Sequence, residues 1–255
     1  MYRDHSVAVV MPIYNEQDHL MRAISRVPAY VDTIVAVDDG STDGTWERLS
    51  EIGHRDIIRL HHSSNRGVGA ATKTGYGYLL ETGTDLIAVM DGDGQMDGRD
   101  LSGLLDRAIA GADYVKGNRF LHRETIRCMP IGRYIGNRIF SWLTRRAAML
   151  EIGLDAQCGY TVIRRSALKR LDLNELYDRY GFPNEMLFAA ARNGFTVETA
   201  PVRCIYDDEI SGINPLTAVP TITWLIARSY LRRKLALSPG PGLLTAQEGE
   251  SNSGN

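Results

Sequence analysis

Short, nearly all-apolar runs alternate with segments of helical periodicity along most of this chain. The runs read SVAVVMPI, DTIVAVDD, DIIRLHH, TDLIAVMD and ADYVKG, and the intervening segments place apolar residues at helical spacing, as Leu20, Ile24 and Val27 do. Strands that are apolar on both sides need cover on both sides, which parallel sheets obtain from crossover helices. The pattern predicts an α/β fold, with a mainly parallel sheet and helices on both faces, over residues 1–215.

Polar residues gather where three of these strands end. PIYNE follows the first strand, DDGSTDGT the second and DGDGQ the fourth. In α/β sheets of this kind, ligands bind beyond the carboxyl ends of the strands. The three strand ends are therefore predicted to converge on one site.

Asp91 and Asp93 lie two residues apart as the fourth strand ends, so their carboxylates can point the same way. Gly92 and Gly94 allow a bulky anion to come close. Two neighbouring carboxylates repel each other unless a hard divalent cation lies between them, and Mg²⁺ or Mn²⁺ held in this way takes its other ligands from water and phosphates. The loop is therefore interpreted as a metal site for a diphosphate, although Asp-Gly pairs are also typical of simple tight turns.

Other ligand-binding motifs fit less well. An EF-hand counted from Asp91 needs Gly at position six and Glu at position twelve, where the chain has Met96 and Ser102. GVGAATKT, at residues 67–74, has Thr72 where a phosphate-binding P-loop needs glycine, and no GxGxxG follows a strand. The sequence thus argues against a calcium loop, a P-loop and a dinucleotide-binding oxidoreductase.

Composition excludes further classes. The formal net charge of -2 gives no general attraction to nucleic acid. Cys128, Cys158 and Cys204 are odd in number and lack metal-ligand spacing, which indicates reduced thiols. With neither a signal peptide nor a long apolar run, the sequence predicts a cytoplasmic protein without a spanning helix.

Two segments outside the strand pattern could meet a membrane. Residues 119–146 carry seven arginines among apolar residues, and residues 216–237 combine Trp224 and Tyr230 with a basic end. Because Pro220 and Arg228 interrupt the apolar stretch, residues 216–237 are predicted to lie on a membrane surface or to form an ordinary packed terminal helix. Residues 238–255 are rich in Pro, Gly, Ser and Asn and are predicted to be a disordered tail.

The motifs PIYNE, VDDGSTDGT, NRGVGAATKTGY, MDGDGQ, KGNR, DAQCGYTVIRRSAL and FPNEML occur in this order. Together they closely resemble family 2 glycosyltransferases, in particular the branch of dolichyl- and polyprenyl-phosphate sugar synthases. The resemblance covers roughly residues 6–206. It implies a GT-A fold, a nucleoside-diphosphate sugar donor, Mg²⁺ or Mn²⁺, and inversion at the anomeric carbon.

The resemblance also implies roles for residues at the donor site. Asp39 would read the base edge with Ser41 nearby, although Ser41 or Asp43 could instead cap the next helix. Asp93 is the predicted catalytic member of the metal group. The implied base and ribose pocket is Pro12, Tyr14 and Glu16, and the implied metal and diphosphate group is Asp91, Asp93 and Gln95.

An arginine cluster is implied at the acceptor site, because guanidinium groups bind phosphate bidentately. If the acceptor were a hydroxyl, an acidic residue near the reaction centre would be the general base. The loop at Asp207, Asp208 and Glu209 departs from lipid-linked relatives, which have basic residues there. The implied acceptor-phosphate ligands are Arg119, Arg133 and Arg138, and the implied residues near the reaction centre are Asp155, Gln157 and Glu185.

The predicted function is transfer of a hexose from a UDP- or GDP-sugar to a polyprenyl (dolichyl-type) phosphate, peripherally on the cytoplasmic face of a membrane. A membrane-anchoring partner or a homo-oligomer remains open. The alternative within the family is transfer to a hydroxyl or amine of a saccharide or small metabolite. Two further alternatives are a sugar-phosphate nucleotidyltransferase and a non-catalytic sugar-nucleotide-binding protein. The nucleotidyltransferase needs a Gly-rich N-terminal loop, which PIYNEQDHL lacks.

Overall fold

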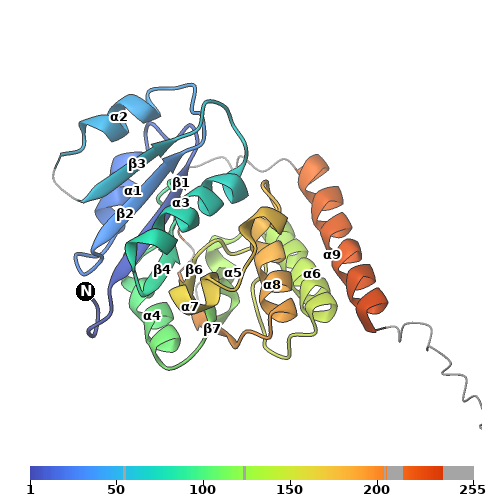
Figure 1. Ribbon diagram of the computed structural model, residues 1–255. Helices are drawn as coiled ribbons and strands as arrows, with labels where there is room; N and C mark the ends of the chain where they lie inside the picture. The colour runs from blue at the N-terminus through green and yellow to red at the C-terminus, as the bar shows by residue number, and fades with distance from the viewer. Residues whose placement is uncertain (54–55, 123–124, 204, 206–214, 238–255) are drawn as a thin grey trace, which may run out of the picture.

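The computed structural model describes residues 1–53, 56–122, 125–203, 205 and 215–237. Within them a single sheet has the strand order β3-β2-β1-β4-β6-β5-β7 (Figure 1). β6 pairs antiparallel with both its neighbours, and every other pairing is parallel. The mainly parallel sheet predicted from the alternating runs is confirmed. The strands are β1 (Val7–Ile13), β2 (Thr33–Asp38), β3 (Ile57–His61), β4 (Leu86–Val89), β5 (Tyr114–Asn118), β6 (Thr161–Arg164) and β7 (Val197–Pro201).

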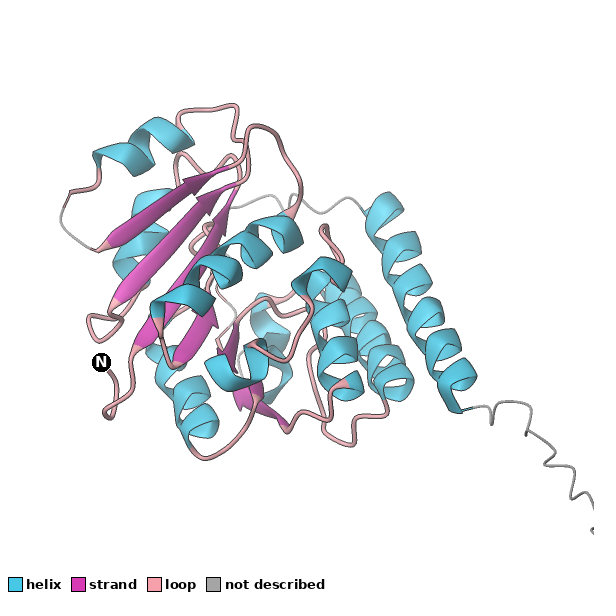
Figure 2. Cartoon of the chain, in the orientation of Figure 1, coloured by secondary structure: helices cyan, strands magenta, loops and turns pink. Residues whose placement is uncertain are grey.

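Helices cover both faces of the sheet, as Figure 2 shows. Alternate residues of β1 enter two different cores: Val7 and Val9 pack with α1 and α4, whereas Ala8 and Val10 pack with α3, α7 and α8. All seven residues of β1 are buried, which explains why this run is apolar throughout. The helices are α1 (Leu20–Arg26), α2 (Thr45–Glu51), α3 (Val68–Thr82), α4 (Leu101–Ile109), α5 (Thr125–Cys128), α6 (Ile131–Ala148), α7 (Arg165–Leu168), α8 (Phe182–Arg192) and α9 (Pro215–Leu237).

The sheet has its topological switch between β1 and β4. The chain leaves β1 toward β2 and β3 on one side and returns to β4 on the other side. The loops after β1 and β4 therefore separate at a crevice, and this is where α/β sheets bind ligands. PIYNE spans the end of β1 and the loop after it, and DGDGQ lies in the loop after β4.

The reversed direction of β6 brings a further segment to the same edge. Thr161, the first residue of β6, pairs with Val89 at the end of β4 and with Lys116 of β5. The residues just before β6, from Asp155 to Tyr160, therefore reach the carboxyl ends of the parallel strands. A wholly parallel sheet would have placed them at the opposite edge.

α9 is a single helix of 23 residues that continues through Pro220. It lies beside α6 and α8 (Figure 1), and Leu225 packs with Ala147, Ala148 and Phe188. Trp224, Tyr230 and Leu231 are exposed on it. Within the described part of the chain, no helix combines the length and the apolar character needed to cross a membrane.

Candidate active site

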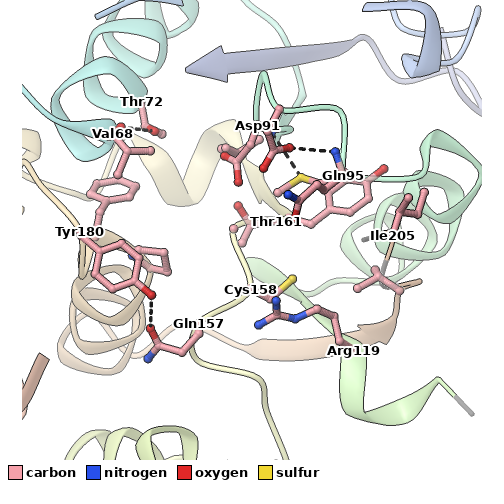
Figure 3. Close-up of a pocket in the computed structure, with 18 of the residues that line it drawn as sticks. Val68, Thr72, Asp91, Gln95, Arg119, Gln157, Cys158, Thr161, Tyr180 and Ile205 are labelled. Atoms are coloured by element: carbon pink, nitrogen blue, oxygen red, sulfur yellow. Dashed lines mark hydrogen bonds between the residues drawn. The ribbon is translucent and has the colours of Figure 1, made fainter. Parts of the chain in front are cut away.

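Two cavities meet at the carboxyl ends of β1 and β4. The larger, about 660 Å³, is lined by residues of the PIYNE loop and the start of α3. The smaller, about 280 Å³, is lined by residues that precede and begin β6 and by arginines from the chain after β5 (Figure 3). Asp91 and Asp93 line both cavities, together with Val68 and Tyr180. The predicted convergence of strand ends on one site is present.

The acidic pair is held by its own backbone. The Gln95 N–H donates to Asp93 Oδ1 at 2.8 Å, and Gln95 lines the smaller cavity beside Asp91. Gly159 allows the pair to approach the loop before β6, because a Cβ at this position would lie 2.7 Å from Asp91 Oδ2. The turn therefore positions carboxylates rather than merely reversing the chain.

Burial raises the pKa of the Asp91 carboxyl to about 7, and the neighbouring Asp93 and Glu16 add to this effect. Burial also raises the pKa of Asp93, against the Gln95 hydrogen bond. A divalent cation would relieve this repulsion, so the donor chemistry fits Mg²⁺ or Mn²⁺. Among the described residues no three His, Cys, Asp or Glu side chains converge as a metal cage. The fit is therefore to an ion held by two carboxylates that takes its other ligands from phosphates and water.

The larger cavity contains most of the predicted donor residues. Pro12, Tyr14, Glu16 and Asp39 all line it. Burial raises the pKa of Glu16, and His19 Nδ1 lies 2.9 Å from Glu16 Oε2.

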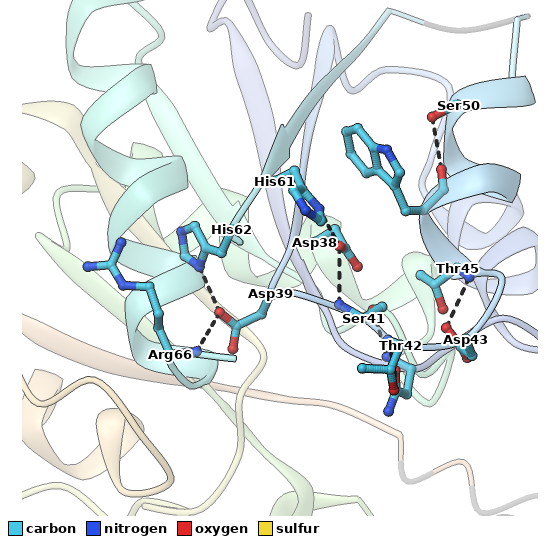
Figure 4. A network of polar contacts seen from close by, with 12 residues as sticks. Asp38, Asp39, Ser41, Thr42, Asp43, Thr45, Ser50, His61, His62 and Arg66 are labelled. Atoms are coloured by element: carbon cyan, nitrogen blue, oxygen red, sulfur yellow. Dashed lines mark hydrogen bonds and ion pairs between the residues drawn. The ribbon is translucent and has the colours of Figure 1, made fainter. Parts of the chain in front are cut away.

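The carboxylate of Asp39 is buried and already bonded. It accepts from the backbone N–H of Arg66 and of Gly67, at 3.0 and 2.7 Å, and lies 2.7 Å from His62 Nδ1 (Figure 4). A carboxylate offers about four acceptor positions, so one position is left for a ligand. Nothing in the sequence pattern indicates that His62 contacts Asp39.

Ser41 does not line either cavity, so the structure does not bring it together with the residues of the predicted base pocket. Its hydroxyl accepts from the Asn15 N–H at 2.9 Å and so joins two loops. Asp43 lies one residue before Gly44, the N-cap of α2, and its carboxylate accepts from the Thr45 N–H at 3.0 Å, so it satisfies the first N–H of the helix without being the capping residue (Figure 4).

Arg119 and Asp155, predicted for separate roles, form one ion pair. Arg119 Nε donates to Asp155 Oδ2 at 2.6 Å and Nη2 to Asp155 Oδ1 at 3.0 Å. Asp155 is fully buried and Arg119 lines the smaller cavity. The pair joins the end of β5 to the loop before β6.

Lys116 is a charged residue for which the sequence pattern indicated no role. It is fully buried on β5, and its Nζ donates to the Cys158 carbonyl at 2.5 Å. Burial lowers the pKa of Lys116 to about 8, although Asp155 and Asp91 favour its charged form. The sequence signal that could have identified Lys116 was its place in the KGNR motif with Arg119. Its burial could not be predicted in this way, because it depends on the pairing of β5 with β6 and β7.

The other two predicted acceptor arginines are separated by the fold. Arg133, on α6, lines the smaller cavity with Arg119. Arg138 is exposed on the same helix, stacks 5.2 Å from the Phe120 ring centroid and lines a different small cavity. The structure therefore does not place Arg138 with the phosphate group.

Gln157 lines the smaller cavity, together with Asp91 and Arg119. Its Nε2 donates to Asn184 Oδ1 at 3.2 Å, and Tyr180 donates to its Oε1 at 3.5 Å (Figure 3). Asn184 in turn donates to Thr144 of α6 at 2.8 Å. The amide of Gln157 is thus oriented by α8.

Glu185 does not line either cavity, so the structure does not bring it together with the other residues predicted around the reaction centre. It is buried on α8, where Arg228 of α9 lies at 2.7 Å and Arg192 at 3.4 Å. Its carboxylate anchors the terminal helix. Sequence spacing could not reveal this because the partner lies on α9.

Other predictions fall partly outside the described residues. The acidic loop at 207–209, Cys204 and the predicted tail at 238–255 lie there, whereas Cys128 and Cys158 are free thiols. Arg203, which precedes the loop, lines the smaller cavity and pairs with Asp100 at 2.9 Å and with Asp97 at 3.3 Å.

Comparison with known proteins agrees with this geometry. The family model described as glycosyl transferase family 2 matches residues 8–172. The chain is 33% identical to polyprenol monophosphomannose synthase of Mycolicibacterium smegmatis, over 76% of this chain and 75% of that protein. It is 30% identical to undecaprenyl-phosphate mannosyltransferase of Micrococcus luteus, over 91% and 99% respectively.

A UDP-N-acetylglucosamine–dolichyl-phosphate N-acetylglucosaminyltransferase of Methanococcus voltae is 28% identical over 80% of this chain and 88% of that protein. Among solved structures, glucosyl-3-phosphoglycerate synthase from Mycobacterium tuberculosis with Mn²⁺, UDP and glucosyl-3-phosphoglycerate superposes with a TM-score of 0.64 at 19% identity, covering 90% of this chain and 80% of that one. This likeness confirms the GT-A fold. With a half-buried acidic pair at the switch point and a family model that matches most of its length, the chain belongs to glycosyl transferase family 2, and it is a sugar-transferring enzyme.

Proposed function

We propose that this enzyme transfers a hexose from a UDP- or GDP-sugar to a polyprenyl phosphate, with inversion at the anomeric carbon. The observation that carries the proposal is the position of Asp91 and Asp93 at the junction of two cavities. One cavity is large enough for a nucleotide, and the other is lined by three arginines, Arg119, Arg133 and Arg203. The names of the relatives, which act on polyprenyl, undecaprenyl or dolichyl phosphate, support the same acceptor class.

In this proposal the nucleoside occupies the larger cavity. Tyr14 offers a face for stacking, and the remaining acceptor position of Asp39 takes an N–H of the base. Asp91 and Asp93, with Gln95 beside them, would hold Mg²⁺ or Mn²⁺, which neutralises charge on the departing nucleoside diphosphate. Solved structures of the same fold contain Mn²⁺ or Mg²⁺ with UDP, which supports this assignment.

The acceptor phosphate would bind in the smaller cavity. A phosphate monoester is largely ionised at neutral pH, so it needs orientation more than deprotonation. Arg119 is held by Asp155 with its guanidinium at the cavity wall, and Arg133 faces the same space from α6. The buried charge of Lys116 behind them adds to the positive potential.

The reaction is then one displacement at the anomeric carbon. An acceptor phosphate oxygen forms the new bond to this carbon while the bond to the donor diphosphate breaks, and the nucleoside diphosphate leaves with the electron pair. Gln157, oriented by Asn184, would hold a sugar hydroxyl. No general base is required for a phosphate acceptor, which agrees with the engagement of Asp155 by Arg119 and of Glu185 by Arg228.

We also infer that the enzyme docks on a membrane through α6. Exposed apolar residues recur along this helix at helical spacing, with two exposed arginines among them. The apolar residues are Ile131, Ile135, Ile139 and Trp142, and the arginines are Arg138 and Arg146. Apolar side chains interspersed with arginines are typical of helices that lie in the lipid interface. Arg133, which lines the smaller cavity, lies on the same helix, so a lipid acceptor held at this surface would have its phosphate near that cavity.

The test is product mass spectrometry on the purified protein with UDP- and GDP-sugars, a short polyprenyl phosphate and Mn²⁺ or Mg²⁺, compared with a metal-free control. A glycosyl-phosphoryl lipid formed only with metal is the expected result, and it identifies the donor. Donor hydrolysis without a lipid product would replace the lipid by a soluble hydroxyl or amine acceptor. No turnover with any donor would overturn the proposal.

A further inference from the structure

We propose that the guanidinium of Arg179 binds the phosphates of the nucleotide donor, as the cationic side chain that the protein itself contributes to the larger cavity. This inference rests on the proposed function, because it assigns the donor to that cavity. Arg179 lies in the segment just before α8, between Tyr177 and Tyr180, and all three residues line the larger cavity.

The charges lining the larger cavity are strongly unbalanced. Four carboxylates line it, and Arg179 is the one cationic side chain among its lining residues, all of which the structure describes. A nucleoside diphosphate brings further negative charge, of which one divalent ion offsets only part. Like charges in a partly enclosed site repel strongly. An anionic ligand is therefore best placed where Arg179 can reach it. The four carboxylates are those of Glu16, Asp39, Asp91 and Asp93.

The guanidinium of Arg179 is available to a ligand. It makes no ion pair or hydrogen bond with any residue in the described part of the chain. Its neighbour Asp178 is instead paired with Lys73, at 2.5 Å. Other arginines of the site are engaged, Arg119 with Asp155 and Arg203 with Asp97 and Asp100.

The stem of Arg179 is fixed against the start of α3. Gly67 has a φ of +106°, and a Cβ there would lie 2.7 Å from Arg179 Cγ. The Asp178 carbonyl accepts from the Ala70 N–H at 2.9 Å, which ties the segment to the first turn of α3. Gly67 also donates to Asp39 at 2.7 Å. The position of Arg179 is therefore set relative to the residues that we assign to the nucleoside.

Arginine suits this role because its planar fork can donate two hydrogen bonds to one phosphate. Lysine would retain the charge but lose the fork. Methionine would retain the length of the stem and lose both.

The experiment is titration calorimetry of UDP and GDP, with Mn²⁺ and without acceptor, on the wild type and on Arg179→Met and Arg179→Lys. Arg232→Met is the matched control, because Arg232 is also exposed and its side chain is unpartnered among described residues, and it lies on α9 away from the lining of the cavity. We expect Arg179→Met to raise the Kd of the diphosphate about ten- to a hundredfold. We expect Arg179→Lys to recover part of this loss, and Arg232→Met to leave the Kd within about threefold of the wild type.

Competition with uridine and guanosine separates contact with phosphate from contact with the base. Nucleoside affinity that is the same in Arg179→Met and the wild type supports the proposal. An equal loss for nucleoside and diphosphate, or an unchanged diphosphate Kd in Arg179→Met, would overturn it. If the wild type binds neither UDP nor GDP, the proposed function fails as well. If the wild type and Arg179→Met bind the diphosphate equally tightly, only the role of Arg179 is disproved.

Discussion

The Arg119 guanidinium donates two hydrogen bonds to the Asp155 carboxylate, at 2.6 and 3.0 Å, in the wall of the smaller cavity. Asp155 is fully buried, so the pair is screened little by water. The consequence is an arginine held at one position before any acceptor arrives. A held fork loses less conformational entropy on binding phosphate than a mobile one.

Replacing Arg119 by Lys keeps the charge but removes the fork. We expect the KM for the acceptor to rise about tenfold or more, and the KM for the donor to change less than about threefold. Steady-state kinetics with each substrate varied in turn measures both constants. Equal rises in the two would contradict an acceptor role. Arg119→Ala should also affect acceptor use more than donor binding, but it leaves Asp155 buried without this partner and should destabilise the fold.

Asp93→Ala should abolish sugar transfer while leaving the fold intact. The pKa of Asp93 is raised by burial, so its removal relieves repulsion from Asp91 in the metal-free protein. We expect turnover to fall by roughly a thousandfold, because losing the metal removes several kcal/mol of transition-state stabilisation. Asp18→Ala, an exposed acid of the PIYNE loop region, is the control. Retained turnover in Asp93→Ala, or full activity after chelation with EDTA, would disprove the metal assignment.

The stability of the metal-free protein should depend on pH through Asp91. Its pKa is raised in the folded protein from 3.8 to about 7, so in that interval the folded state holds a proton that the unfolded state has lost. The Asp91 carboxyl therefore adds to the free energy of unfolding at low pH, and this contribution decreases as the pH rises from about 4 to about 7.

Thermal unfolding across this range measures the slope, and Asp91→Asn should flatten it. Because a metal competes with the proton, Mn²⁺ should raise the Tm more at pH 7.5 than at pH 5.5. A Tm increase of the same size at both pH values would argue against metal binding by this carboxylate.

Glu185→Gln should lower stability without removing catalysis. Its carboxylate is buried between Arg228 and Arg192, so neutralising it leaves these arginines without their partner. We expect a loss of about 2–4 kcal/mol in the free energy of unfolding, measured by urea denaturation. The kcat of the folded fraction should stay within about threefold. A kcat reduced a hundredfold at unchanged stability would restore the role of general base.

The exposed face of α6 should determine vesicle binding. Ile135→Ser with Ile139→Ser removes apolar area that is already exposed, so folding should be little affected. We expect binding to anionic vesicles in a sedimentation assay to weaken by roughly tenfold. Met21→Ser on α1, exposed elsewhere, serves as the control. If Met21→Ser weakened vesicle binding as much as the double change on α6, then α6 would not be the docking surface.

The amino-acid sequence by itself determined the α/β class and the edge of the sheet that carries the site, because strand and helix periodicity are local properties of the chain. Apolar runs such as VAVVMPI predict buried parallel strands, and Asp91, Asp93, Tyr14 and Asp39 follow such strands directly. Their convergence needs no further information than the common direction of the strands.

Only the tertiary structure decided which side chains act together away from those loops. Arg119 meets Asp155 because β6 runs antiparallel, and Glu185 is removed from the cavity because Arg228 approaches it from α9. Arg138 and Arg133 share a helix but face different cavities, and the spacing of arginines does not reveal which helix face is covered. These outcomes depend on contacts between distant segments, whose energies are set by packing and burial rather than by any local pattern.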